Sequence, residues 1–270
     1  MSASWSVVAP AVRCRAFTLA ELLVVIAIVL ALIAILLPSF NAVRRSSLAI
    51  KDLANLRALQ SAQLSYAADH NGYLADARLP HGGVGQGIEH SFVTTLKPYY
   101  DSAFAVRSPL DHSEHWPAES GGAGVPVPGS TDRMRVTSYG INNYLARQYS
   151  PQAAVDPSLM TDRLSKVHSP AATIHMLLMT ETGEYAGSDH PHVEGWGSIN
   201  AAPLVASTQV ATSAAGGLAK TGDARSNWSF LDGHVATLRF NNVFINDTVN
   251  HFDPAVSGLF DARIGGASGS

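Results

Sequence analysis

The chain is almost free of cysteine, which limits how it can be stabilised. Cys14 is the single cysteine among its 270 residues, so no disulfide can form within the chain. Arg13 and Arg15 flank this cysteine, whereas the lipid-attachment signal of a lipoprotein requires apolar and small residues there. A lipid anchor at Cys14 is therefore excluded. The chain is long enough for one sizeable domain, which must be held by its own apolar core.

Charged residues are also few. They account for 14% of the chain, and the formal net charge is −3 at pH 7. Such a balance gives no basic field, so we predict no nucleic-acid partner. The Gly-x-Ser-x-Gly elbow of many hydrolases does not occur either. The glycine-rich stretch 81–87 lacks the Lys-Ser/Thr ending of a phosphate-binding loop. We predict no catalytic residues and no enzymatic activity.

What the sequence does contain is one long apolar run near its N-terminus. The run is unbroken from Leu22 to Leu37 and is followed by Pro38. About twenty apolar residues in a helix span the hydrocarbon core of a bilayer, so residues 17–40 are predicted to be transmembrane. Glu21 lies one turn inside this helix, where a carboxylate is costly and requires a partner or a function. Pro38 removes a backbone hydrogen bond and predicts a kink.

The helical pattern continues over residues 41–70 without Gly or Pro. One row of apolar side chains recurs at helical spacing and is expected to cover a sheet; it consists of Ala42, Ala49, Leu53, Leu56, Leu64 and Ala67. A second row lies beside it, formed by Leu48, Leu59 and Tyr66. This second row either faces a neighbouring subunit or widens the same core face. His70-Asn71-Gly72 predicts the end of the helix.

Residues 71–270 are predicted to form a globular domain of short strands and long loops. Residues 134–139 and 173–180 favour strands, the second of them buried. The clearest signal is a hairpin over residues 228–240 with Asp232-Gly233 at its turn. We expect a type I′ turn there, in which both central residues have positive φ.

Two histidine-rich stretches are candidates for metal ligands. Residues 111–115 read Asp-His-Ser-Glu-His, and residues 189–194 read Asp-His-Pro-His-Val-Glu. Neither has the His-Glu-x-x-His or His-x-x-Glu-His order that places two ligands on one helical face. Their Pro, Gly and Ser neighbours favour solvent-exposed loops, so we predict no metal site, with ligation as the alternative. The tryptophans Trp116, Trp196 and Trp228 either bind sugars or pack in the fold.

The N-terminal residues carry a specific resemblance. Ala16, then Phe17-Thr18-Leu19-Ala20-Glu21, the apolar run and Pro38 resemble the processing site of type IV prepilins and type II secretion pseudopilins. The resemblance implies that a prepilin peptidase cuts between Ala16 and Phe17 and methylates the new amine of Phe17. Residues 1–16 would then be a leader, with Ala16 standing where the family usually has Gly. Glu21 becomes the fifth residue of the mature chain and Pro38 the twenty-second, as in the family.

Cleavage before Phe17 also gives Glu21 a physical partner. The freed amine of one chain would lie near Glu21 of a neighbour in a staggered helix bundle, and opposite charges attract strongly in a low dielectric. Glu21 would thereby set the register between subunits. The alternative is a lone membrane anchor whose carboxylate reaches the interface.

The resemblance implies a fold and a function for the whole chain. The expected fold is α+β and pilin-like, with a long N-terminal helix packed on an antiparallel sheet. The expected function is a structural subunit of a type IV pilus-like or type II secretion pseudopilus filament. The protein would cross the inner membrane once, with its C-terminal domain extracytoplasmic. The alternative is a membrane-anchored binding protein, for example for a polysaccharide, that uses the prepilin signal only for delivery.

Two further expectations follow from related groups. We expect no cofactor; the alternative is calcium, which some pseudopilins hold in a C-terminal loop and for which Glu181, Glu184 and Asp189 have suitable spacing. The C-terminal part resembles a planctomycete-type group that ends in His, nine residues and Asp-Gly, although Gly222 stands in place of the His. Segments 108–111 and 138–142 resemble the middle of that group. This second resemblance implies architecture rather than activity.

Overall fold

The computed structural model describes residues 18–81, 87–100 and 106–260. The expected leader and the cleavage and methylation site at Ala16 and Phe17 lie outside these residues. The chain divides into two compact units, residues 1–44 and residues 45–270. Inside the first helix the side chains of five residues are also not described: Leu36, Pro38, Ser39, Asn41 and Ala42.

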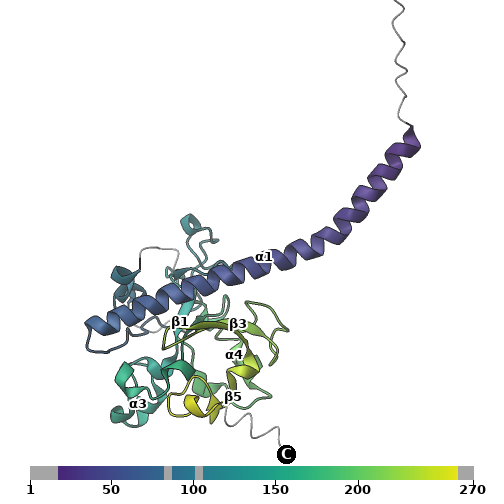
Figure 1. The fold of residues 1–270 in the computed structure, drawn as a ribbon. Helices are drawn as coiled ribbons and strands as arrows, with labels where there is room; N and C mark the ends of the chain where they lie inside the picture. The colour runs from purple at the N-terminus through teal and green to yellow at the C-terminus, as the bar shows by residue number, and fades with distance from the viewer. Residues whose placement is uncertain (1–17, 82–86, 101–105, 261–270) are drawn as a thin grey trace, which may run out of the picture. The chain divides into compact units, whose positions relative to one another are not determined.

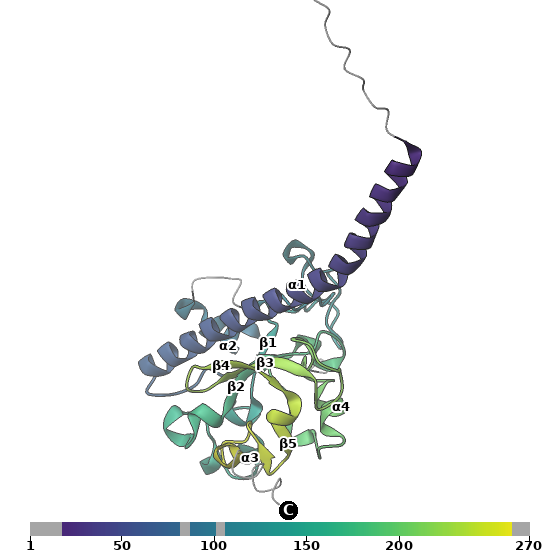
Figure 2. The same ribbon diagram turned by 45° about the vertical axis from the view of Figure 1, so that its right-hand side comes forward.

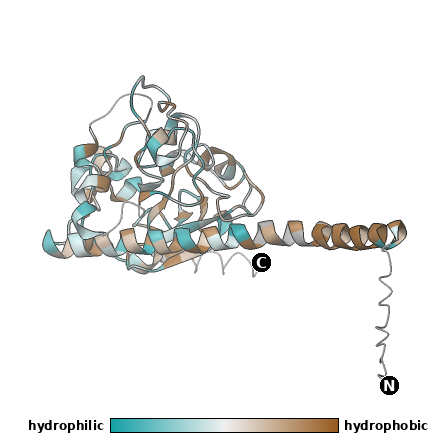
Figure 3. Ribbon diagram, turned by 90° about the horizontal axis from the view of Figure 1, so that it is seen from above, coloured by the Kyte–Doolittle hydropathy of each residue, from teal (hydrophilic) through white to brown (hydrophobic). Residues whose placement is uncertain are grey.

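One helix occupies the N-terminal part of the described chain. Helix α1 (Leu19–Asp69) contains 51 residues and continues through Pro38. Figure 3 shows the apolar colouring of its first part, where the large side chains from Leu22 to Ile35 that are described are exposed. The predicted long helix is confirmed, whereas the kink at Pro38 stays a prediction.

No helix reaches the combination of length and apolar content needed to cross a membrane when the described residues alone are counted.

The end of α1 follows from local sequence. Gly72 has φ +81° and Asn71 has φ +55°, and the Gly72 N–H donates to the carbonyl oxygen of Ala67 at 2.7 Å. A left-handed residue of this kind reverses the chain and satisfies a free helix carbonyl. The predicted helix stop at residues 70–72 is confirmed.

The sheet against which α1 packs has four antiparallel strands in the order β1-β2-β3-β4. The strands are β1 (Tyr139–Ile141), β2 (Ile174–Leu178), β3 (Arg225–Phe230) and β4 (Val235–Arg239). A separate pair is formed by β5 (Phe244–Asn246) and β6 (Val249–Asn250). Short helices α2 (Phe92–Thr95), α3 (Pro151–Val155) and α4 (Ala202–Ala206) lie in the connections. Figures 1 and 2 both show the C-terminal part of α1 lying across this sheet.

The strand predictions are correct in part. Strand β2 is buried along its whole length, as predicted for residues 173–180. The strand expected at 134–139 begins only at Tyr139. The backbone before Tyr139 pairs with loops rather than with a strand: the Arg135 N–H donates to the His115 carbonyl at 2.9 Å and the Ser138 N–H to the Val106 carbonyl at 2.8 Å.

The predicted hairpin is confirmed, but the predicted type I′ turn is wrong. Strands β3 and β4 pair with Ser229 opposite Val235. Gly233 has φ +107°, but Asp232 is not among the residues with positive φ. The Gly233 N–H donates to the Phe230 carbonyl at 3.0 Å, and the Phe230 N–H donates to the His234 carbonyl at 2.9 Å. This pattern is typical of a three-residue loop closed by a glycine bulge rather than of a type I′ turn.

Both faces of the sheet are buried, each by its own apolar cluster. On one face Leu56 and Leu59 of α1 pack with Tyr139 and Met176, and Leu48 and Tyr66 lie against this cluster. The second row, Leu48, Leu59 and Tyr66, therefore belongs to the same core face as Ala49 and Leu56 of the first row. The other face is covered by an aromatic cluster that contains Trp196, Trp228, Phe240, Phe244 and Phe252.

The tryptophans belong to the packing of the fold. Trp196 is fully buried and makes edge contacts with Phe244 and Phe252 at centroid distances of 5.2 and 5.0 Å. Trp116 and Trp228 are buried too. The sugar-binding interpretation of these three side chains is wrong because their rings are enclosed by the protein.

Candidate functional site

The start of α1 is built around Glu21. The N–H and the hydroxyl of Thr18 donate to Glu21 Oε2 at 2.9 and 2.8 Å, and the Glu21 N–H donates to Thr18 Oγ1 at 3.2 Å. This reciprocal pair is a capping box, which satisfies free N–H groups at a helix start. Sequence reasoning missed it, although Thr-x-x-Glu before an apolar run is its signature. Glu21 therefore has a structural role within its own chain.

Asp52 joins the second half of α1 to the sheet. Its Oδ1 accepts hydrogen bonds from the Ser108 hydroxyl at 2.5 Å and the Tyr139 hydroxyl at 2.6 Å, and its Oδ2 accepts from Asn227 Nδ2 at 2.7 Å. Burial raises the pKa of Asp52, and the hydrogen bonds from Ser108, Tyr139 and Asn227 oppose that rise. A buried carboxylate with three donors specifies one position of the helix on the sheet.

Gln60 makes a second polar connection about two turns further along α1. Its Oε1 is 2.7 Å from His175 Nδ1 of β2 and accepts a hydrogen bond from the Ser229 hydroxyl of β3 at 2.8 Å. An amide oxygen only accepts, so His175 Nδ1 carries the proton in this arrangement. His175 Nε2 has no hydrogen-bond partner among the described residues, and burial lowers the pKa of His175 to about 3. His175 is therefore a neutral, structural histidine.

The two segments that resemble the planctomycete-type group meet in space. Asp111 and Arg135 form an ion pair at 2.7 Å in which both side chains are about fully buried, at 1% exposure. The Ser138 hydroxyl donates to Asp111 Oδ2 at 2.6 Å, and the Ser108 N–H donates to Ser138 Oγ at 2.8 Å. The predicted exposed loop at 111–115 is thus wrong for Asp111, Ser113 and His115, which are buried by partners from elsewhere in the chain.

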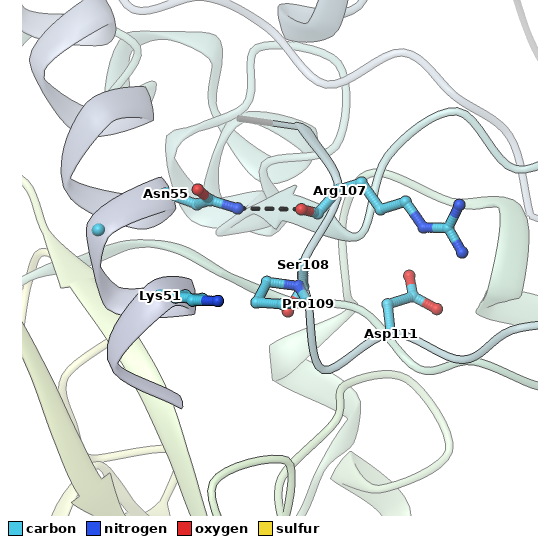
Figure 4. Close-up of a pocket in the computed structure, with 7 residues that line it drawn as sticks. Lys51, Asn55, Arg107, Ser108, Pro109 and Asp111 are labelled. Carbon is cyan, nitrogen blue, oxygen red and sulfur yellow. Dashed lines mark hydrogen bonds between the residues drawn. The ribbon is translucent and has the colours of Figure 1, made fainter. Parts of the chain in front are cut away.

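A pocket lies beside these segments and α1. Its volume is about 480 Å³, and Lys51, Asn55, Ser108 and Asp111 are among its lining residues. Figure 4 shows Asn55 Nδ2 donating across it to the Arg107 carbonyl at 3.0 Å. Ser108 and Asp111 use their polar atoms for the internal hydrogen bonds above, so the pocket carries no ligand assignment.

Three histidines form a different kind of cluster. One ligand nitrogen from each of His81, His190 and His192 lies within 4.8 Å of the other two, and the Nε2 atoms of His81 and His192 are 2.9 Å apart. Tyr149 stacks on His190 at 3.6 Å, and Tyr185 stacks on His81 at 4.7 Å between ring centroids. Among the described residues, no other group of three or more His, Cys, Asp or Glu side chains gathers in this way.

Asp189 holds together the two loops that carry these histidines. Its Oδ2 accepts from the Arg78 N–H at 2.9 Å and the Ser91 hydroxyl at 2.7 Å, and its Oδ1 accepts from the Leu79 N–H at 2.9 Å. Its own carbonyl accepts from the Ile141 N–H of β1 at 2.7 Å. Asp189 is fully buried, which corrects the prediction that 189–194 is an exposed loop.

Burial favours the neutral form of two of these imidazoles, those of His81 and His190. Burial, with the neighbouring His190 and His192, lowers the pKa of His81 although Glu184 opposes this. Burial likewise lowers the pKa of His190 against the opposing effect of Asp189. A neutral imidazole is the form that binds a metal ion.

The three acidic residues expected to bind calcium each contact a different part of the chain. Asp189 binds backbone N–H groups as described, Glu181 Oε1 accepts from the His112 N–H at 3.1 Å, and Glu184 lies 3.7 Å from His81. Glu181, Glu184 and Asp189 do not gather into a described cluster of oxygen ligands. The sequence analysis named His190 and His192 as candidate ligands but missed His81, because His81 is 111 positions from His192 and spacing motifs detect only ligands on one local element.

Comparisons of the chain with protein-family models, with curated proteins and with solved structures each found no match.

Proposed function

We propose that this protein is a prepilin-like structural subunit of a type IV pilus-like or type II secretion pseudopilus filament. The observation that carries the proposal is the composition of α1. Its first part exposes apolar side chains from Leu22 onward, while its second part is packed into the domain core. Large contiguous apolar surfaces mark contacts with a membrane or with other proteins.

In this proposal residues 17–40 cross the inner membrane and later form the seam between subunits. The segment includes Phe17, which lies outside the described residues, and Leu36 and Pro38, whose side chains are not described. Close packing of small and apolar side chains would drive helix association there. The domain from residue 45 onward would be extracytoplasmic and form the filament surface. Prepilin peptidase and other pilin or pseudopilin subunits are the proposed partners.

Processing is tested by the mass of the protein. Intact-mass spectrometry of protein extracted from membranes of its native host should show loss of residues 1–16 and the addition of one methyl group at Phe17. Protein that begins at Met1 in the native host would contradict the proposal and leave an anchored domain.

Glu21→Ala is expected to leave membrane insertion intact and to reduce filament assembly at least about tenfold, since the terminal amine of a neighbour would lose its carboxylate partner. Crosslinking through cysteines placed in α1 measures assembly as a ladder of oligomers.

Glu21→Gln is the matched variant for that experiment. Its amide oxygen can still accept from the Thr18 N–H, as Glu21 does at 2.9 Å, so the capping box is kept while the charge is removed. Loss of assembly in both variants supports a charge pair between subunits. Normal assembly by either variant contradicts that role for Glu21.

The three tryptophans no longer support the alternative of an anchored polysaccharide-binding protein, because their side chains are buried. Crosslinking also separates the two functions, since an anchored binding protein would yield monomers instead of a ladder.

A further inference from the structure

The histidine cluster has the spacing of metal ligands. The Nε2 atoms of His81 and His192 are 2.9 Å apart, and the ligand atoms of all three imidazoles lie within 4.8 Å of one another. In a tetrahedral zinc site with bonds of 2.0–2.1 Å, neighbouring nitrogens lie about 3.3 Å apart. The separation of 2.9 Å is slightly shorter than this value and the other separations do not exceed 4.8 Å, so small movements of the rings bring the three nitrogens to one ion.

His190 provides independent evidence for an absent partner. Its side chain has no exposed surface, and its Nε2 has no hydrogen-bond partner among the described residues. A buried polar atom without a partner is costly, and native proteins contain few of them. A metal ion bound to Nε2 would remove this cost.

We propose that His81, His190 and His192 bind one divalent transition-metal ion of the zinc class through their Nε2 atoms. Imidazole nitrogen is a preferred ligand for zinc and its neighbours in the first transition row, whereas calcium prefers oxygen. Three protein ligands leave a fourth position open, as in catalytic rather than structural zinc sites. The side chains of His81 and His192 are partly exposed, at 26% and 29%, so solvent can reach the cluster.

Each imidazole also has a carboxylate next to its other nitrogen. In metal sites a ligating histidine commonly donates its second N–H to a carboxylate, which fixes the tautomer and orients the ring. His190 Nδ1 lies 3.2 Å from Asp189 and His192 Nδ1 lies 2.9 Å from Glu194, both within hydrogen-bond distance, whereas His81 Nδ1 is 3.7 Å from Glu184 and forms only a charge pair. The Nε2 atoms of His81 and His192 form a hydrogen bond with each other at 2.9 Å, which a bound metal ion would replace.

The supporting residues are themselves held in place. Asp189 is bound to the backbone of Arg78 and Leu79, directly before the loop that presents His81. Glu194 Oε2 accepts from Asn143 Nδ2 at 2.6 Å, and the His192 N–H donates to Gln209 Oε1 at 2.8 Å. Rigid support of this kind is what a binding site requires to hold ligand geometry. The metal-site proposal does not depend on the proposed filament function, and each can be contradicted without the other.

The test uses the full chain in detergent, stripped with a chelator and titrated with Zn²⁺ by calorimetry, with metal content measured after dialysis. We expect one zinc ion per chain. His81→Ala and His192→Ala should each weaken zinc binding more than about tenfold, because even a lost supporting residue costs 10–100-fold in metal affinity. His168→Ala is the matched control, since this histidine is exposed and outside the cluster, and it should bind as the wild type does.

Two further measurements test folding and the role of the carboxylates. Zinc should raise the melting temperature of the wild type and of His168→Ala, but not that of His81→Ala, while calcium should raise none of them. Circular dichroism confirms that the variants are folded, and the partly exposed His81 and His192 are chosen because truncation of His190 would open a cavity. Glu194→Gln should weaken binding by about tenfold or more.

Two results would overturn the proposal. One is a folded, stripped wild type that binds no zinc up to millimolar concentration. The other is binding by His81→Ala and His192→Ala that is as tight as that of the wild type.

Discussion

Arg135→Met is expected to destabilise the domain by about 3–5 kcal/mol, because it leaves the buried Asp111 carboxylate without its cation. The pair is closed at 2.7 Å with both side chains at 1% exposure. Arg135 also donates to the carbonyls of Thr180 at 2.7 Å and of Met179 at 3.3 Å, and to that of Ala186. Methionine fills a similar volume and supplies none of these donors. Urea unfolding followed by tryptophan fluorescence measures the loss.

The surface pair Arg239–Asp223 provides the control. Its atoms are 3.4 Å apart and its side chains are 51% and 73% exposed, so Arg239→Met should cost less than about 1 kcal/mol. The double variant Asp111→Leu/Arg135→Met should be more stable than Arg135→Met alone, since it contains no unpaired buried charge. If Arg135→Met unfolds within about 1 kcal/mol of the wild type, Asp111 must find another partner and our account of the pair is incorrect.

Acid should destabilise the domain through His175. In the unfolded chain an imidazole has a pKa of about 6.5, whereas burial lowers the pKa of His175 to about 3. Between these values the unfolded state binds a proton that the folded state does not. Stability is therefore fully present above about pH 6.5 and falls by up to about 1.4 kcal/mol for each pH unit below it.

The variant His175→Gln isolates this contribution. Glutamine does not titrate, and its amide can donate to Gln60 as His175 Nδ1 does at 2.7 Å. The unfolding free energy of the wild type should therefore fall relative to that of the variant by about 2 kcal/mol from about pH 6.5 to about 4.5. His81 and His190, whose pKa values are also lowered, act equally in both proteins and cancel. Parallel pH profiles for the two proteins would contradict the neutral state of His175.

Local signals in the sequence predicted the elements that depend on neighbours along the chain. The helix stop at Gly72, the buried strand at 173–180 and the Asp232-Gly233 hairpin each rest on a few adjacent residues. The turn type was wrong because Asp-Gly fits two hairpin loops, and the path of the flanking strands decides between them.

Polar residues in the core were the part that the sequence could not reveal. Asp52 and Gln60 are of polar residue types that are mostly exposed, yet both are fully buried. Their partners are remote: Asn227 is 175 positions from Asp52, and His175 is 115 positions from Gln60. The histidine cluster was not predicted for the same reason: His81 is far from His190 and His192 in the sequence, and only the folded chain brings them close.

The polar contacts of α1 also have a mechanical consequence. Asp52 and Gln60 are eight positions apart, or about 12 Å along the helix axis, and each is fastened to more than one strand or loop. A force along this axis would act on the hydrogen bonds of Asp52 and of Gln60 at the same time, so they would not break one after the other. Sliding by one turn, about 5.4 Å, would strip every donor from a buried carboxylate. We therefore expect the contact between α1 and the sheet to resist sliding as one unit, because both sets of hydrogen bonds must break together.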